Sequence, residues 1–158
     1  MELADILSEE SVIVCTGLKT KREVLERLAE QAAKATGQDA RAVFEAVYDR
    51  EVLGSTGLGN GIAIPHGKFA GIPGVTAVFA RLSDPVDFDS VDDQPVDLIF
   101  ALFAPKDAGA EHLRALARVS RLLRQAELRE QLRQARTADA IHALLVQDGG
   151  SSARSSAA

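Results

Sequence analysis

The sequence predicts an α/β fold, a single-domain sandwich in which a mixed β-sheet is flanked by helices on both faces. Two observations favour this class: short apolar runs typical of strands, and segments of helical periodicity that occur before, between and after them. The chain has 158 residues, 46% hydrophobic and 26% charged, which suits one domain with an ordinary core and not two full domains. Only 4% of the residues are aromatic, so the core is expected to consist of leucine, valine, isoleucine and alanine.

Four apolar runs are predicted to form strands. The first, SVIVC at 11–15, is rich in β-branched residues and precedes Thr-Gly, as a buried strand ending in a turn would. The others are IAIP at 62–65, VTAVFARL at 75–82 and VDLIFALFA at 96–104, and the last two have the composition of central strands. Between these two, the segment 83–95 is acidic and turn-prone. The pattern does not indicate the order of the strands in the sheet.

Two helices are predicted between the first two strands. Thr20 and Glu23 form a capping box, and apolar residues then recur at helical spacing until Gly37, which can adopt the left-handed conformation that ends a helix. Asp39 can cap a second helix, which ends near Arg50 where a glycine-rich stretch begins.

The C-terminal third is predicted to be helical. After Pro105 comes a helix, followed by a second over 126–135 and a third capped by Thr137. The apolar face of the first of these helices is expected to comprise Leu113, Leu116, Ala117 and Leu123. Residues 1–147 would form the domain. The tail 148–158, DGGSSARSSAA, has no apolar anchor and is expected to be mobile.

Composition narrows the classes of function. The net charge is −5 and no basic stripe is interleaved with aromatic residues, so nucleic-acid binding is not expected. No segment approaches the roughly 18 to 20 apolar residues of a spanning helix and the start of the chain is acidic, so a cytoplasmic protein without membrane insertion is predicted. Cys15 is the only cysteine and is expected to be buried and inert. The histidines have no HExxH-type spacing, so neither a metal nor another cofactor is predicted.

The three histidines lie in different contexts. His66 follows a predicted strand and precedes a glycine, which favours an accessible imidazole that can act as a nucleophile near pH 7; a surface-loop histidine is the alternative. His112 flanks the apolar face of a helix, so a buried structural role is the default, although beside His66 it could donate a hydrogen bond to a phosphoryl oxygen or orient the first ring. His142 has no evident polar partner, and we expect it to be exposed and without a role.

The stretch GSTGLGNG at 54–61 offers backbone N–H groups and small hydroxyls that can surround an anion, although such loops also occur as plain connectors. The segment from Gly61 to Lys68 is not a nucleotide P-loop, because the spacing from Gly61 to Gly67 is one residue too long and Phe69 stands where Ser or Thr must bind magnesium. GLGNG fails the dinucleotide fingerprint, since it lacks the last required glycine and leads into a strand. Arg50, just before it, either caps the end of its helix or clamps a phosphoryl group.

The run LGSTGLGNGIAIPHGK after Arg50, with AEHLRALARVSRLL further on, resembles the enzyme IIA proteins of the bacterial phosphotransferase system, in the fructose, mannitol and nitrogen-related group. The resemblance covers about residues 3–147. It implies that His66 is the phosphorylated residue, His112 its neighbour, and Arg50 the cation that stabilises the phosphorylated state. Less firmly, it places small polar residues around the phosphoryl group, namely Ser55, Thr56 and Asn60.

The same resemblance implies a phosphocarrier that accepts a phosphoryl group from an HPr-like protein and signals to regulatory target proteins through its phosphorylation state. The free-standing chain is similar to the nitrogen-related regulatory type. A sugar-specific enzyme IIA that passes phosphate to a IIB protein is one alternative, and a regulator that binds proteins independently of phosphorylation is another. A metal-dependent hydrolase is a third hypothesis, which bound metal would support.

Overall fold

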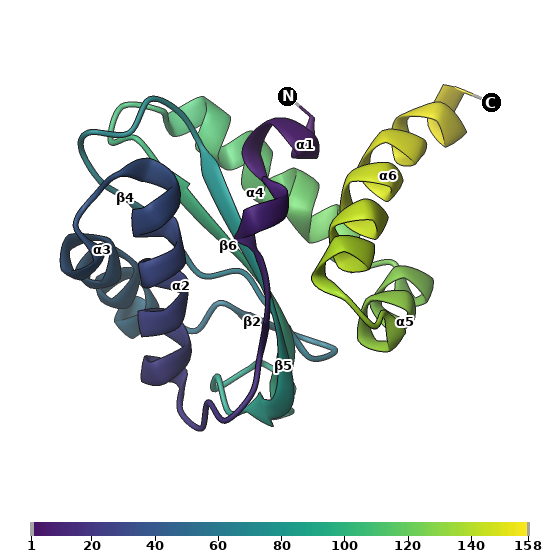
Figure 1. The fold of residues 1–158 in the computed structure, drawn as a ribbon, viewed down its shortest axis with the longest axis horizontal. Helices are drawn as coiled ribbons and strands as arrows, with labels where there is room; N and C mark the ends of the chain where they lie inside the picture. Colours follow the sequence, from purple (N-terminus) through teal and green to yellow (C-terminus); the bar gives the residue numbers. More distant parts are fainter. Residues whose placement is uncertain (1, 158) are drawn as a thin grey trace.

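The computed structural model describes residues 2–157, with side chains over 2–147. A mixed sheet divides the domain into two layers of helices (Figure 1). Helices α2 (Lys21–Thr36) and α3 (Ala40–Leu53) pack on one face, and α1 (Leu3–Ile6), α4 (Gly109–Leu123), α5 (Ala126–Gln134) and α6 (Ala138–Ala157) lie on the other. The predicted α/β sandwich is therefore confirmed, with a hydrophobic cluster on each face of the sheet.

Within the described residues the sheet has six strands. These are β1 (Val12–Cys15), β2 (Gly57–Gly59), β3 (Ile62–Ala63), β4 (His66–Lys68), β5 (Thr76–Val86) and β6 (Val96–Ala104). The order is β1-β5-β6-β3-β2, and β4 also pairs with β6. Strand β5 is parallel to β1 and antiparallel to β6, whereas β3 and β4 both run parallel to β6. Since β6 is bonded on both sides and packed on both faces, all of its residues but Asp97 are buried.

The strand expected at 62–65 is shorter than predicted, since β3 ends at Ala63, and a second short strand, β4, begins at His66. Ile62 lies opposite Leu98 and His66 lies opposite Leu102, so β3 and β4 keep one register along β6. Pro65 separates them because proline has no N–H to donate to a ladder, while its carbonyl still accepts the Leu102 N–H at 2.9 Å. The interruption places His66 at the start of a strand.

The helix boundaries follow the predicted capping residues. The Thr20 hydroxyl accepts the Glu23 N–H at 3.1 Å, and Gly37 ends α2 with a φ of 73°. Asp39 accepts the Ala42 N–H at 3.1 Å at the start of α3. Helix α1 and the short 3₁₀ helix Glu9–Ser11 were not expected from the sequence.

The predicted apolar face of α4 is wrong in part. Leu113 is 67% exposed and Ala117 is exposed, whereas Leu123 is buried and Leu116 packs partly against the core. The residues of α4 that face the sheet are His112, Ala115, Val119, Leu122 and Leu123. Their spacing is also helical, so packing against β6 and not leucine content decides which face is buried. The buried face of α4 therefore includes His112.

The C-terminal helix extends into the segment expected to be a mobile tail, because α6 is helical to Ala157. The side chains of 148–158 lie outside the described residues, so the mobility of this tail stays a prediction. No helix in the described part of the chain is long and apolar enough to cross a bilayer.

Candidate functional site

His66 is held in one tautomer by the backbone beside it. Its Nδ1 lies 2.9 Å from the carbonyl oxygen of Ile64, and because a carbonyl only accepts, Nδ1 carries the proton. The lone pair is then on Nε2. The ring is half-buried, and its pKa is lowered by burial and by the charge of Arg50, against opposing effects of the Ile64 bond and of Glu51. His66 is therefore a neutral imidazole with a free ring nitrogen at neutral pH.

His112 lies beside His66, as the interpretation of the two histidines required. The ring centroids are 5.3 Å apart with 55° between the planes. His112 is only 4% exposed, and its Nδ1 is buried without a hydrogen-bond partner. Burial, followed by the charges of His66 and Lys68, lowers the pKa of His112 to about 4. The second ring is thus also neutral at pH 7, and its Nδ1 is an exception to the rule that buried polar atoms are hydrogen-bonded.

Arg50 stands in the last turn of α3, on the exposed side of the same site. Its Nη1 donates to the carbonyl oxygen of Gly54 at 2.9 Å, so it satisfies an acceptor at the end of the helix. It is also close enough to His66 for its charge to lower the pKa of that ring. The capping role is present in the structure, and the role as a phosphoryl clamp stays a prediction.

The hydroxyl groups of Ser55 and Thr56 are engaged within the loop that precedes β2. Ser55 Oγ donates to the carbonyl of Phe88 and accepts the Gly57 N–H at 3.0 Å. Thr56 is buried, and both its N–H and its hydroxyl donate to the carboxylate of Glu51, at 2.8 and 2.6 Å. These side chains hold the loop in place, and phosphate contacts from them stay predictions.

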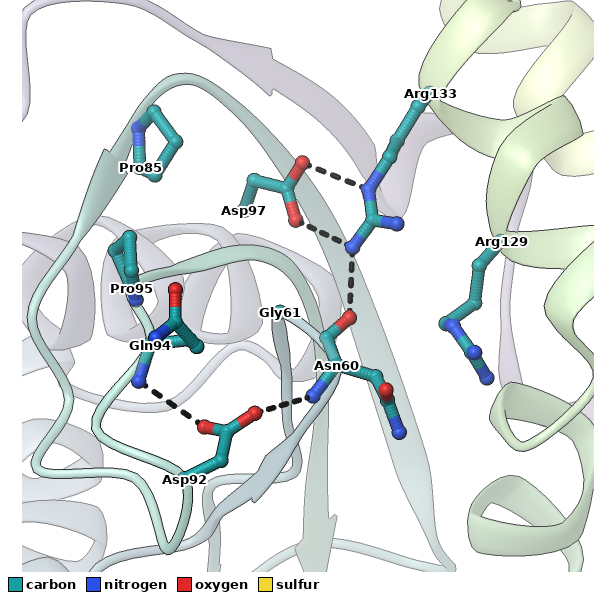
Figure 2. Close-up of a pocket in the computed structure, with 9 residues that line it drawn as sticks. All are labelled: Asn60, Gly61, Pro85, Asp92, Gln94, Pro95, Asp97, Arg129 and Arg133. Carbon is teal, nitrogen blue, oxygen red and sulfur yellow. Dashed lines mark hydrogen bonds and ion pairs between the residues drawn. The ribbon is translucent and has the colours of Figure 1, made fainter.

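Asn60 lies in a different setting, at the turn between β2 and β3 (Figure 2). Its N–H donates to Asp92 at 3.0 Å, and its carbonyl accepts from Arg133 Nη2 at 2.8 Å. Arg133 also forms a two-point ion pair with Asp97, at 2.9 and 3.0 Å. This ion pair joins α5 to the beginning of β6.

The register of the sheet separates Asn60 from the histidines. Ile62 lies opposite Leu98 and His66 opposite Leu102, so the two positions are four residues apart along β6, and Asn60 lies beyond Ile62. At about 3.3 Å per residue, the hairpin turn is roughly 15 Å from His66. The structure does not bring Asn60 together with the two histidines and Arg50, and a phosphate contact from it stays a prediction.

Glu51 and Lys21 belong to the site region but were not singled out in the sequence. Glu51 is 5% exposed, and Lys21 Nζ lies 3.1 Å from its carboxylate. One signal was available for Glu51, because Val43, Val47 and Glu51 follow one another at four-residue spacing and share the buried face of α3. A charge on an apolar face needs a partner. Nothing in the sequence marks Lys21 as that partner.

Two other residues test the sequence interpretation. The prediction that His142 is exposed is wrong: it is half-buried, and its Nε2 donates to the carbonyl oxygen of Leu7 at 2.9 Å, joining α6 to the N-terminal segment. Cys15 is buried as expected, and burial raises the pKa of its thiol. Among the side chains described, no group of three or more His, Cys, Asp or Glu residues could hold a metal ion.

Comparison with solved structures places this fold among the IIA proteins. Nitrogen regulatory protein IIA-Ntr from Neisseria meningitidis matches with a TM-score of 0.84 and 38% identity, over 90% of this chain and 98% of that one. IIA mannitol from Escherichia coli matches with a TM-score of 0.71 and 26% identity, over 85% and 96%.

The chain belongs to the family described as "Phosphoenolpyruvate-dependent sugar phosphotransferase system, EIIA 2", whose model matches residues 5–148. It is 47% identical over 145 residues to a nitrogen regulatory protein of Bradyrhizobium diazoefficiens, covering 92% of this chain and 95% of that protein. It is also 38% identical to the fructose-specific EIIABC component of Bacillus subtilis, covering 89% of this chain but 22% of that protein. The resemblance seen in the sequence is confirmed.

Proposed function

We propose that this chain is a phosphocarrier that accepts a phosphoryl group on Nε2 of His66 from an HPr-like protein. The observation that carries the proposal is the bond from His66 Nδ1 to the Ile64 carbonyl, which leaves Nε2 unprotonated on a half-buried ring. Membership of an enzyme IIA family supports it independently. A neutral imidazole with one fixed nitrogen is a competent nucleophile for phosphorus.

The transfer step needs no resident metal or cofactor. The Nε2 lone pair attacks the phosphorus of the donor's phosphohistidine, so the new N–P bond forms as the old one breaks and the donor imidazole leaves with its electron pair. The Nδ1 proton stays on His66, held by Ile64, and balances one charge of the incoming group. We assign Arg50 and His112 to the phosphoryl oxygens, because the first carries a positive charge that acts on His66 and the ring of the second lies beside that of His66.

The phosphorylation state is the proposed output. A phosphoryl group carries roughly −1.5 to −2 charges near neutral pH, and at a half-buried surface position it changes which proteins can dock. Nitrogen regulatory relatives that match over nearly their whole length favour this regulatory type. Regulatory target proteins and a cytoplasmic location remain part of the proposal.

A sugar-specific role is the second candidate. Fructose-specific proteins are among the relatives, and the IIA mannitol protein of Escherichia coli, 25% identical, has been solved in a complex with phosphorylated enzyme IIB mannitol. The two roles differ in the acceptor, since a sugar-specific chain would pass its phosphoryl group on to a IIB protein. A phosphorylation-independent regulator would instead bind its partners equally well with and without the group.

The test is to incubate the chain with a radiolabelled, phosphorylated HPr-like carrier and to map the label by mass spectrometry in alkaline solution. We expect label on His66 in the parent, none in His66→Ala, and parental labelling in the matched control His142→Ala. In His112→Ala, transfer should slow by roughly 100-fold, as for the loss of one fixed hydrogen-bond donor, while His66 still accepts. Equal labelling of His66→Ala and the parent would show that the proposal is wrong.

The labelled chain also separates the candidate roles. Discharge of the label to a fructose-type or mannitol-type IIB protein would support the sugar-specific role. Retention of the label, with target proteins that distinguish the two states, would support the regulatory role. Binding that ignores both the label and His66→Ala would support the phosphorylation-independent regulator.

A further inference from the structure

The buried carboxylate of Glu51 is joined to His66 by an unbroken series of hydrogen bonds. Glu51 accepts the Thr56 N–H at 2.8 Å and the Thr56 hydroxyl at 2.6 Å. The Thr56 carbonyl then accepts the Ile64 N–H at 3.1 Å. The Ile64 carbonyl in turn accepts the Nδ1 proton of His66 at 2.9 Å. Each bond fixes the residue that makes the next one.

Lys21 makes the burial of this carboxylate possible. The Glu51 side chain is only 3% exposed, and a buried charge is stable only when it is paired and hydrogen-bonded. Lys21 Nζ lies 3.1 Å from Oε2, and its other contacts are the Asp89 carboxylate at 3.6 Å and the Phe88 ring at 5.2 Å. With Lys21 and both Thr56 donors on it, the carboxylate is engaged at both oxygens. It is placed to hold these donors in position.

We propose that Glu51, neutralised by Lys21, is a positioning residue for phosphoryl transfer: through Thr56 and Ile64 it fixes the orientation and tautomer of His66. This rests on the proposed function of His66 as phosphoryl acceptor. Glu51 itself touches neither the reacting nitrogen nor the incoming phosphorus. Its effect is to keep Nε2 aimed outward with its lone pair free, since a ring free to rotate or to exchange its proton would often present the wrong nitrogen.

Electrostatics joins Glu51 to His66 by a second route. Burial of the ring lowers the pKa of His66, the hydrogen bond to Ile64 opposes this, the positive charge of Arg50 lowers the pKa further, and the negative charge of Glu51 raises it. The other charged or titratable groups around the paired rings are His112 on α4 and Lys68 on β4. Removing the charge of Glu51 is therefore expected to shift the His66 titration to lower pH, a change that loss of packing alone would not produce.

The experiment compares Glu51→Gln with a matched control, Asp97→Asn. Both variants remove one carboxylate charge that pairs with a cation on a helix. Asp97 lies near the start of β6, whereas His66 lies opposite Leu102, near the end of β6. The measurements are the rate of labelling by a phosphorylated HPr-like carrier, and the NMR titration of the His66 ring in the full chain. For Glu51→Gln we expect labelling at least roughly ten-fold slower and a titration midpoint at lower pH. For Asp97→Asn both should match the parent.

A second pair of variants, both at Thr56, changes the structure less and covers the case in which Glu51→Gln fails to fold. Thr56→Val keeps the side-chain shape and the Thr56 N–H but removes the hydroxyl donor to Glu51, so labelling should slow by a few-fold. Thr56→Ser restores that donor and should recover the parental rate. Parental labelling and titration in Glu51→Gln would overturn the inference, as would parental labelling in Thr56→Val if that variant alone folds. So would equal slowing in Asp97→Asn.

The outcomes keep this inference apart from the proposed function. If the parent takes no label on His66, the phosphocarrier proposal fails, and the NMR titration still reports whether Glu51 controls the ring. If the parent is labelled and Glu51→Gln behaves like it, only the positioning role fails.

Discussion

Residues 60–68 run along β6, from the hairpin turn at Asn60 to the region around His66. Both ends contain an ion pair, but they differ in the hydrogen-bonding groups that are left without a partner. Near His66, the Glu51 carboxylate pairs with Lys21 of α2; at the hairpin turn, the Asp97 carboxylate pairs with Arg133 of α5. The first ion pair joins α2 to α3, and the second joins α5 to the start of β6. Around the hairpin turn, the carboxylates drawn in Figure 2 are all engaged by N–H donors.

At the His66 end, hydrogen-bonding capacity is left over. Nε2 of His66 has a lone pair, and Nδ1 of His112 is buried without a partner. Buried polar atoms are normally satisfied, and here the unsatisfied nitrogen lies beside a ring whose tautomer is fixed. The comparison teaches that charged residues alone do not mark the site, because the hairpin end also contains them. Unsatisfied nitrogens next to a fixed tautomer do.

The largest expected effect at the His66 end is a loss of stability in acid. The pKa of His112 is lowered to about 4 by burial, whereas an unfolded histidine titrates near 6.5. The unfolded chain therefore binds a proton that the folded chain rejects, and stability falls as the pH drops from about 6.5 to about 4, by up to about 3 kcal/mol. The lowered pKa of His66 adds in the same direction.

Urea unfolding of the parent and of His112→Gln at pH 7 and pH 4.5 measures this effect. We expect the pH dependence to be smaller in His112→Gln, because that variant has no buried imidazole to protonate. His142→Gln serves as the control, since it removes a histidine whose Nε2 bonds to Leu7 far from the site. If His112→Gln loses as much unfolding free energy between pH 7 and pH 4.5 as the parent does, His112 is not the cause of the loss.

At the hairpin end, the expected effect is on stability alone. Gly61 has a φ of 77°, and a Cβ there would meet the Arg133 guanidinium and, at 2.8 Å, the Asp97 carboxylate. Gly61→Ala should therefore cost about 2 kcal/mol of unfolding free energy while labelling of His66 at 25 °C stays at the parental rate. Thermal unfolding tests it against Gly74→Ala, where a Cβ meets open space. Slower labelling in Gly61→Ala would mean that the two ends are coupled.

Most of the fold could be predicted from the sequence because it is encoded locally. Thr20, Gly37 and Asp39 end or begin helices through their own backbone and side-chain chemistry. The exposed Leu113 shows where local information stops, since two helical faces of α4 were possible and only contact with β6 chooses between them. The division of the strand at Pro65 could have been foreseen from its missing N–H.

The site was predicted in part, and for a similar reason. Gly67 and the strand before His66 indicate an accessible imidazole, but its approach to His112 depends on the packing of α4. Asn60 shows the reverse case, because the family resemblance suggested a shared site and the extended backbone carries it roughly 15 Å away. Pairings such as Lys21 with Glu51 span 30 residues and leave no local pattern.

Arg50 should give the smallest effect on stability and the sharpest contrast between its two possible roles. Its guanidinium is exposed and donates to Gly54, so Arg50→Ala is expected to cost less than about 1 kcal/mol of unfolding free energy. If the cation also binds the phosphoryl group, the same variant should slow labelling of His66, or shorten the lifetime of the label, by roughly ten-fold. Arg41→Ala, an exposed arginine at the other end of α3, is the matched control and should change neither. A variant that is as stable as the parent and labels and retains label like it would leave Arg50 as a helix cap alone, and the phosphoryl group would then depend on His112 and the loop backbone.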